Sequence, residues 1–232
     1  MPEGQARGVP RHFSESDGAS EADREKVAAA CRDLYRQGWA PGTAGNVSVR
    51  AGDRVTISAS GRAKGRMSPR DTVVVSLNDG APLVGESERP SAETSIHLAI
   101  YANVPAARAV VHAHPPYATA LAATCEHGSR SVEFGRWELA KGLGGPGLAD
   151  TTVPVFRNWT DVPRIAEDVA DALAAARDDR SPTTPALLIA CHGATTWGSD
   201  LLEAVNRLEC VEGLSHLTLL TGNLGDPERC RT

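Results

Sequence analysis

Three histidines lie where they could bind one metal ion. His112 and His114 are two positions apart at the end of the apolar run 109–111, and His192 follows a second apolar run, 186–190. Side chains at positions i and i+2 of a strand point to the same face, so His112 and His114 can reach the same ion. Three imidazole ligands leave one coordination position for water or substrate, as in catalytic zinc sites. The spacing therefore predicts a metal centre, although a His-x-His pair on its own more often marks two partly buried, hydrogen-bonded histidines.

The segments that carry these histidines belong to an alternation of strands and helices. Period-two or β-branched runs predict strands at residues 47–50, 55–58, 71–77, 109–111, 152–156 and 186–190. Apolar residues at helical spacing, together with helix-start residues, predict helices over residues 20–38, 91–102 and 161–177, and from Pro115 and Asp200 onward. Many strands are short and follow tight turns. We therefore expect an α/β fold of three layers (αβα), in which helices flank a mostly antiparallel central sheet.

Composition and charge narrow the class of protein. The chain has 232 residues, of which 41% are hydrophobic and 23% charged, and a formal net charge of −5. Scattered Lys and Arg side chains argue against a nucleic-acid partner, and the apolar runs are far shorter than the roughly 18 residues of a membrane span. Five cysteines without a Cys-x-x-Cys pair indicate reduced thiols rather than disulfides. We predict a cytoplasmic protein, with a disordered tail over residues 1–19 and one domain over residues 20–232.

Short segments of small residues could bind a phosphate group. Residues 42–48 are Gly-Thr-Ala-Gly-Asn-Val-Ser, and residues 58–61 are Ser-Ala-Ser-Gly. Small residues let backbone N–H groups approach an anion closely, and neighbouring side chains add donors and a positive charge. A glycine-rich turn alone is usually only a turn, so this prediction depends on the neighbouring motifs. The candidate phosphate contacts are Thr43, Gly45, Asn46, Ser60, Gly61, Lys64 and Ser91.

The order and spacing of these segments resemble those of the class II aldolase/adducin family. The turn at residues 42–48, the loop at 58–61, the segment 90–97 and the three histidines follow one another as in that family, over about residues 25–220. The resemblance implies a class II aldolase-like fold, one Zn²⁺ per subunit on the three histidines, a sugar-phosphate substrate and a homotetramer with active sites at subunit boundaries. It also implies that Glu93 lies close to the metal. We expect His97 to be packed or hydrogen-bonded behind the site rather than to be a ligand.

Other segments resemble the branch of this family that dehydrates 5-methylthioribulose 1-phosphate in methionine salvage. These segments are residues 60–69, 138–143, 153–163 and 196–201. The resemblance implies a lyase that forms 2,3-diketo-5-methylthiopentyl 1-phosphate, with Glu138 as acid and base, although Glu93 is a rival for that role. Tyr117, just beyond the histidine pair, is a candidate for lining the substrate pocket.

Two other functions stay open. An aldolase would cleave a 5-substituted deoxy-ketose 1-phosphate to dihydroxyacetone phosphate and an aldehyde, because a metal-polarised ketone serves both reactions. A non-catalytic scaffold is the third possibility. Adducin-type members lack the complete histidine triad that this chain retains, which argues against it.

Overall fold

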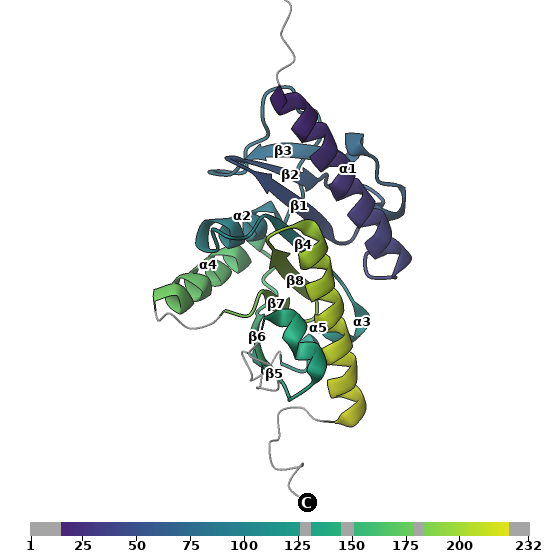
Figure 1. The fold of residues 1–232 in the computed structure, drawn as a ribbon, viewed down its shortest axis with the longest axis vertical. Helices are drawn as coiled ribbons and strands as arrows, with labels where there is room; N and C mark the ends of the chain where they lie inside the picture. The colour runs from purple at the N-terminus through teal and green to yellow at the C-terminus, as the bar shows by residue number, and fades with distance from the viewer. Residues whose placement is uncertain (1–14, 126–130, 145–150, 179–182, 223–232) are drawn as a thin grey trace, which may run out of the picture.

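The computed structural model describes residues 15–125, 131–144, 151–178 and 183–222, with side chains from residue 21 onward (Figure 1). In these residues eight strands form one sheet in the order β3-β2-β1-β4-β8-β7-β6-β5. Neighbouring strands are antiparallel, except β6 and β7, which are parallel. The predicted mostly antiparallel sheet is thus confirmed. The strands are β1 (Asn46–Ala51), β2 (Arg54–Ser58), β3 (Thr72–Ser76), β4 (Ala109–Ala113), β5 (Ser131–Phe134), β6 (Thr151–Phe156), β7 (Ala186–Ile189) and β8 (Gly193–Gly198).

Helices cover both faces of this sheet, which makes the predicted three layers (Figure 1). The helices α1 (Glu15–Arg36), α3 (Pro116–Ala123) and α5 (Leu201–Thr221) pack on one face, and α2 (Thr94–Asn103) and α4 (Val162–Asp178) on the other. Short 3-10 turns lie at η1 (Lys64–Arg66), η2 (Pro69–Asp71) and η3 (Glu138–Leu143). Because side chains alternate along β4, Val111 belongs to the α1/α3/α5 core and Val110 to the α2/α4 core. His112 therefore points to the face that α2 covers.

The structure differs from the sequence-based expectation in three elements. Helix α1 begins at Glu15 rather than near Ser20, so helix replaces the last residues of the predicted tail, while residues 1–14 lie outside the described residues. Strands β5 and β8 were not predicted. Strand β8 follows β7 after a very short turn and is bounded by Gly193 and Gly198, which resemble loop residues, although the sequence between them is rich in β-forming types.

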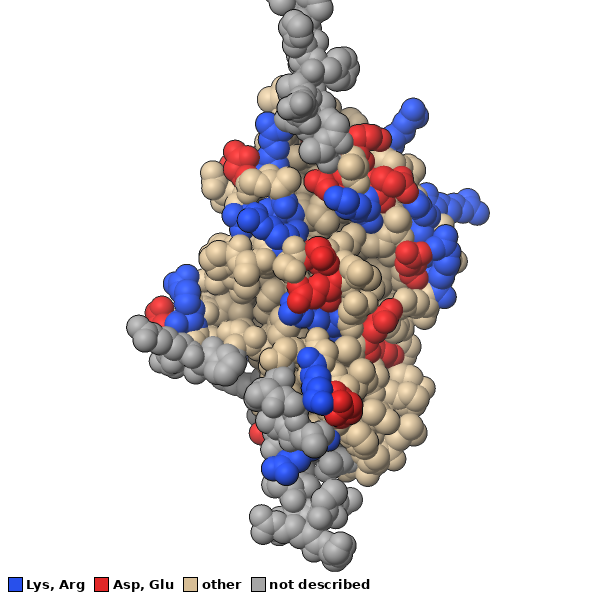
Figure 2. All heavy atoms as spheres, in the orientation of Figure 1, with Lys and Arg blue, Asp and Glu red and all other residues tan. Residues whose placement is uncertain are grey.

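Charged side chains of both signs lie on the surface of the domain (Figure 2). Acidic and basic side chains are interspersed over the face shown in Figure 2. Within the described part of the chain, no helix has both the length and the apolar character that crossing a membrane requires.

Glu212 of α5 caps the first turn of α3. Its carboxylate oxygens accept hydrogen bonds from the backbone N–H groups of Tyr117 (3.1 Å) and Ala118 (2.8 Å). The first N–H groups of a helix lack intrahelical partners, so the carboxylate both pairs two of them and complements the positive end of the helix. Burial raises the pKa of Glu212, while the two N–H donors lower it. Because α3 begins just after His114, this contact fixes the path of the chain as it leaves that histidine.

Glu212→Gln is expected to lower the free energy of unfolding by about 1–2 kcal/mol, because a single amide oxygen replaces two acceptors for one buried and one partly buried N–H group. Urea denaturation followed by circular dichroism measures the change. Glu209→Gln on the same helix is the control, since Glu209 is exposed, and it should change the value by less than about 0.5 kcal/mol. Equal losses in the two variants would contradict the capping role.

Candidate metal centre

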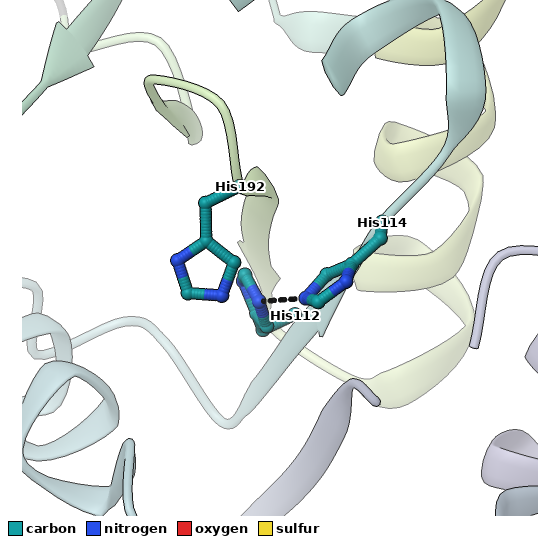
Figure 3. Close-up of side chains that lie close together, drawn as sticks. All are labelled: His112, His114 and His192. Carbon is teal, nitrogen blue, oxygen red and sulfur yellow. Dashed lines mark hydrogen bonds between the residues drawn. The ribbon is translucent and has the colours of Figure 1, made fainter. Parts of the chain in front are cut away.

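The three histidines meet where β4 ends and β7 turns into β8. His112 is in β4 and His114 follows the strand, while His192 lies in the β7–β8 turn, and β8 pairs with β4. Cys191 takes a left-handed backbone conformation, with φ of 54°, at this turn. Figure 3 shows the three side chains converging from these segments. Their ring centroids lie 4.9–5.1 Å apart.

This donor set fits a divalent metal ion. One nitrogen from each ring lies within 4.8 Å of the others, and the Nε2 atoms of His112 and His114 are 3.1 Å apart. Tetrahedral ligands at zinc–nitrogen distances would be about 3.3 Å apart. The Nδ1 atom of His112 is held 2.9 Å from the Thr195 hydroxyl, which leaves Nε2 facing the other rings. Within the described residues, Nδ1 of His192 is buried without a hydrogen-bond partner.

Burial keeps two of the histidines, His112 and His114, in the form that binds metal. It lowers the pKa of His112 to about 3 and also lowers the pKa of His114, because a charged imidazolium loses hydration in the interior. Metal ions bind the unprotonated imidazole nitrogen. The two rings are therefore ready to act as ligands at neutral pH.

Glu93 brings a carboxylate to the same place from the start of α2. Its oxygens lie 3.3 Å from Nε2 of His112 and 3.1 Å from Nε2 of His192, and Asn46 donates to it at 2.8 Å. Burial alone would raise the pKa of Glu93, but His112, with hydrogen bonds from His192 and Asn46, outweighs burial and lowers this pKa. Glu93 is therefore an ionised group beside the triad.

The predicted phosphate segments adjoin one another beside the triad. Gly45 has φ of +78°, and a Cβ atom there would lie 3.0 Å from the His112 carbonyl oxygen, so the close approach of this turn to β4 requires glycine. Gly61 also has a positive φ, +71°. The Ser60 N–H donates to the Arg89 carbonyl, which joins the second loop to the segment before α2. Ser91 in that segment accepts a hydrogen bond from the Glu93 N–H at 3.3 Å.

Lys64 and Asn46 are more constrained than the sequence suggested. Lys64 is buried rather than an accessible point charge, and its ammonium group donates to the carbonyls of Thr43 (3.0 Å) and Arg62 (3.1 Å). It therefore ties the two loops together. The Asn46 amide is bonded to Glu93 and, through its oxygen, to His97 at 2.6 Å. Both side chains thus hold other parts of the site in place.

Two predicted site residues do not join the triad. Glu138, in η3, has a side chain that is 74% exposed and pairs with Lys141 at 2.6 Å. Among the described residues, Glu138 makes no hydrogen bond or ion pair with Glu93 or the histidines. Tyr117 is partly exposed and stacks on His216, with ring centroids 3.7 Å apart.

Sequence reasoning missed three hydroxyl groups around this centre. Thr195 holds His112, and it could have been found only by placing β8 next to β4. The Ser48 hydroxyl is hydrogen-bonded to His97, behind the triad, and the Tyr101 hydroxyl is hydrogen-bonded to Ser48. Asn46 and Ser48 are in β1, whereas His97 and Tyr101 are in α2. No sequence pattern links these two elements.

The fold and the triad define an α/β protein built to hold a divalent metal beside a carboxylate. Residues 25–219 match the family described as Class II Aldolase and Adducin N-terminal domain. The chain belongs to this family, whose members generally use a divalent metal ion.

Two relatives and one solved structure are similar to this chain over most of its length. A probable bifunctional methylthioribose-1-phosphate isomerase/methylthioribulose-1-phosphate dehydratase of Nocardia farcinica is 48% identical over 85% of this chain, but the match spans 35% of that longer protein. The methylthioribulose-1-phosphate dehydratase of Sorangium cellulosum is 40% identical over 89% of this chain and 98% of its own length. A crystal structure of YgbL, a putative aldolase/epimerase/decarboxylase from Escherichia coli, has a TM-score of 0.73 at 29% identity, covering 88% of this chain and 92% of its own.

The chain is expected to bind about one divalent ion through the triad. His114→Gln should weaken Co²⁺ affinity at least about tenfold, because it removes one of three nitrogen ligands. Equilibrium dialysis and the visible absorption of Co²⁺ measure the binding. His216→Gln, which alters a histidine outside the triad, should bind Co²⁺ as the unaltered chain does. Unchanged affinity in the His114 variant would contradict the assignment.

Proposed function

We propose that the chain is a zinc-dependent lyase that dehydrates 5-methylthioribulose 1-phosphate to 2,3-diketo-5-methylthiopentyl 1-phosphate, a step of methionine salvage. The observation that carries the proposal is the full-length match to a relative named for this dehydration, in a chain that keeps three converging imidazoles and an adjacent carboxylate. A cytoplasmic location is part of the same proposal.

In the proposed reaction the triad, Glu138 and Glu93 have different roles. When bound to His112, His114 and His192, zinc would polarise the substrate ketone and acidify the neighbouring C–H bond. Glu138 would take the proton from C3 and return a proton to the hydroxyl that leaves C4 as water. The enol that remains tautomerises to the second ketone, so no oxidant or reductant is needed. The ionised Glu93 carboxylate would orient the end of the substrate that carries the ketone, next to the metal.

The phosphate group is assigned to the paired loops beside the triad. Their residues are mostly small, so that an anion could approach the backbone closely, and the start of α2 adds the positive end of a helix. Lys64 would contribute chiefly by joining the Thr43 and Arg62 carbonyls, which sets the distance between the loops. The site therefore suits a ketose with its phosphate at C1, next to the reacting ketone.

The position of Glu138 supports an active site shared between subunits. Its side chain is exposed and separate from the triad of its own chain. A homotetramer in which Glu138 of one chain completes the site of its neighbour would bring the acid/base group to the substrate. This arrangement follows the symmetry expected of a closed ring of identical subunits.

Retro-aldol cleavage is the second candidate. It is favoured by the structural likeness to a protein titled a putative aldolase/epimerase/decarboxylase. The triad and Glu93 would serve cleavage equally well, so the products, and not the metal ligands, distinguish the two reactions.

Glu138→Gln is expected to retain the metal and lower kcat for dehydration at least about 100-fold, because an amide cannot take up the C3 proton. Turnover is measured by ³¹P NMR and bound metal by atomic emission. Glu133→Gln, at an exposed carboxylate of β5, is the matched control and should keep its activity. If Glu93→Gln alone abolishes turnover while Glu138→Gln does not, the acid and base assignment is wrong.

Mixed assemblies test whether the site is shared. Co-expressed Glu138→Gln and His114→Gln chains should regain about a quarter of wild-type turnover, because random pairing places an intact Glu138 beside an intact triad in that share of sites. Light scattering should give the mass of four chains. No regained activity in assemblies shown to contain both variants would contradict a shared site.

A further inference from the structure

A row of buried polar side chains runs from Glu93 into the layer formed by α2. Asn46 donates to Glu93 at 2.8 Å, and the Asn46 oxygen lies 2.6 Å from Nε2 of His97. Nδ1 of His97 lies 2.7 Å from the Ser48 hydroxyl, which in turn lies 2.8 Å from the Tyr101 hydroxyl. Asn46, Ser48, His97 and Tyr101 are all buried. None of them is a member of the metal triad.

The chemistry of these groups allows one direction of hydrogen bonding. The ionised carboxylate of Glu93 can only accept, so the Asn46 nitrogen faces it and the Asn46 oxygen faces His97. Nε2 of His97 must then carry the proton. Burial lowers the pKa of His97 to about 4, so the ring is neutral and its Nδ1 must accept from the Ser48 hydroxyl. The Tyr101 hydroxyl completes the row by donating to Ser48, whose hydroxyl and carbonyl oxygens lie at 2.8 and 3.2 Å.

The orientation of each side chain in this row therefore depends on the hydrogen bond that it makes with the next one. If His97 could not donate from Nε2, the Asn46 amide would lose the contact that selects its orientation. Turning the amide over would place its oxygen against the Glu93 carboxylate, where two acceptors repel each other. The carboxylate would then lose the hydrogen bond that helps to hold it between His112 and His192.

We propose that His97 is a positioning residue, which orients the Asn46 amide and thereby holds the Glu93 carboxylate in place at the metal ligands. The role in turnover rests on the proposed dehydratase function, whereas the effect on metal binding does not. This role requires a hydrogen-bond donor at the position of Nε2 and an acceptor at the position of Nδ1. A glutamine at position 97 can place its amide nitrogen near the Nε2 position, while the shorter asparagine reaches only the Nδ1 position.

Co²⁺ affinity of the purified full-length chain tests this role. His97→Asn should weaken Co²⁺ binding about tenfold, the usual cost of removing a partner that orients a metal site. His97→Gln should stay within about threefold of the unaltered chain, because it can restore the donor to Asn46. Equal weakening by the two substitutions would overturn the proposal. Ile96→Val, a buried change on the same helix, is the packing control and should leave the affinity unchanged.

A double-mutant cycle separates positioning from general damage to the fold. In a Glu93→Gln background, His97→Asn should weaken Co²⁺ binding by less than about twofold, because the carboxylate that it positions is gone. The same tenfold loss in both backgrounds would overturn the proposal. Should His97→Asn fail to fold, the Co²⁺ affinity of Ser48→Ala tests the same role. This substitution removes the hydroxyl that donates to Nδ1 of His97 and so favours the tautomer with the proton on Nε2. Unchanged Co²⁺ affinity in Ser48→Ala would equally overturn the proposal.

The turnover measurement is kept separate from the binding measurement. With 5-methylthioribulose 1-phosphate, His97→Asn should lower kcat about tenfold with KM within about threefold, because Glu93 acts at the reacting end of the substrate. If the unaltered, Co²⁺-loaded chain does not dehydrate this substrate, the proposed function fails. The Co²⁺ affinities would still decide the positioning role of His97.

Discussion

The site requires that four electron-pair donors, three imidazoles and one carboxylate, lie close together in a largely buried position. The imidazoles of His112, His114 and His192 turn nitrogen atoms toward a common point, and the Glu93 carboxylate adds a negative charge beside them. Such groups gain little from mutual approach until a cation lies among them, and among the described residues Nδ1 of His192 is buried without a hydrogen-bond partner, which costs roughly 1–3 kcal/mol. A divalent ion among these donors would offset the crowding of their lone pairs. The surrounding fold must therefore keep the donors in place.

The centre of the sheet provides that rigidity. Strand β4 pairs with β1 and β8, so that Asn46 and Thr195 lie opposite His112 on its two sides. These register positions place the amide that binds Glu93 and the hydroxyl that binds His112 without any flexible connection. Helix α2 covers the same face and supplies Glu93. Groups mounted on paired strands and packed helices hold their geometry better than groups on free loops.

The sequence predicted much of this arrangement because the relevant patterns are local. The two-residue spacing of His112 and His114 at the end of an apolar run predicted that both reach one place, although His114 lies just beyond β4, and apolar periodicity located most of the helices. Strand β8 was not predicted, because its flanking glycines and very short turn resemble a loop. The contact between Asn46 and Glu93 spans 47 positions, and the one between His112 and Thr195 spans 83, so neither could be derived before the strand order was known. Likewise the burial of Lys64 follows from the packing of the loops and not from its own neighbours in sequence.

The three histidines fit the family that residues 25–219 match, but they leave the reaction open, since dehydration and retro-aldol cleavage would both begin at a metal-polarised ketone. The choice depends on the residues that reach C3 and C4 of the substrate, a role that we propose for Glu138. The most direct measurement is the identity of the products when the metal-loaded chain is incubated with 5-methylthioribulose 1-phosphate and followed by ³¹P NMR. The account predicts a single diketone phosphate with the carbon chain intact. Release of dihydroxyacetone phosphate, or an unchanged substrate in the presence of bound metal, would contradict it.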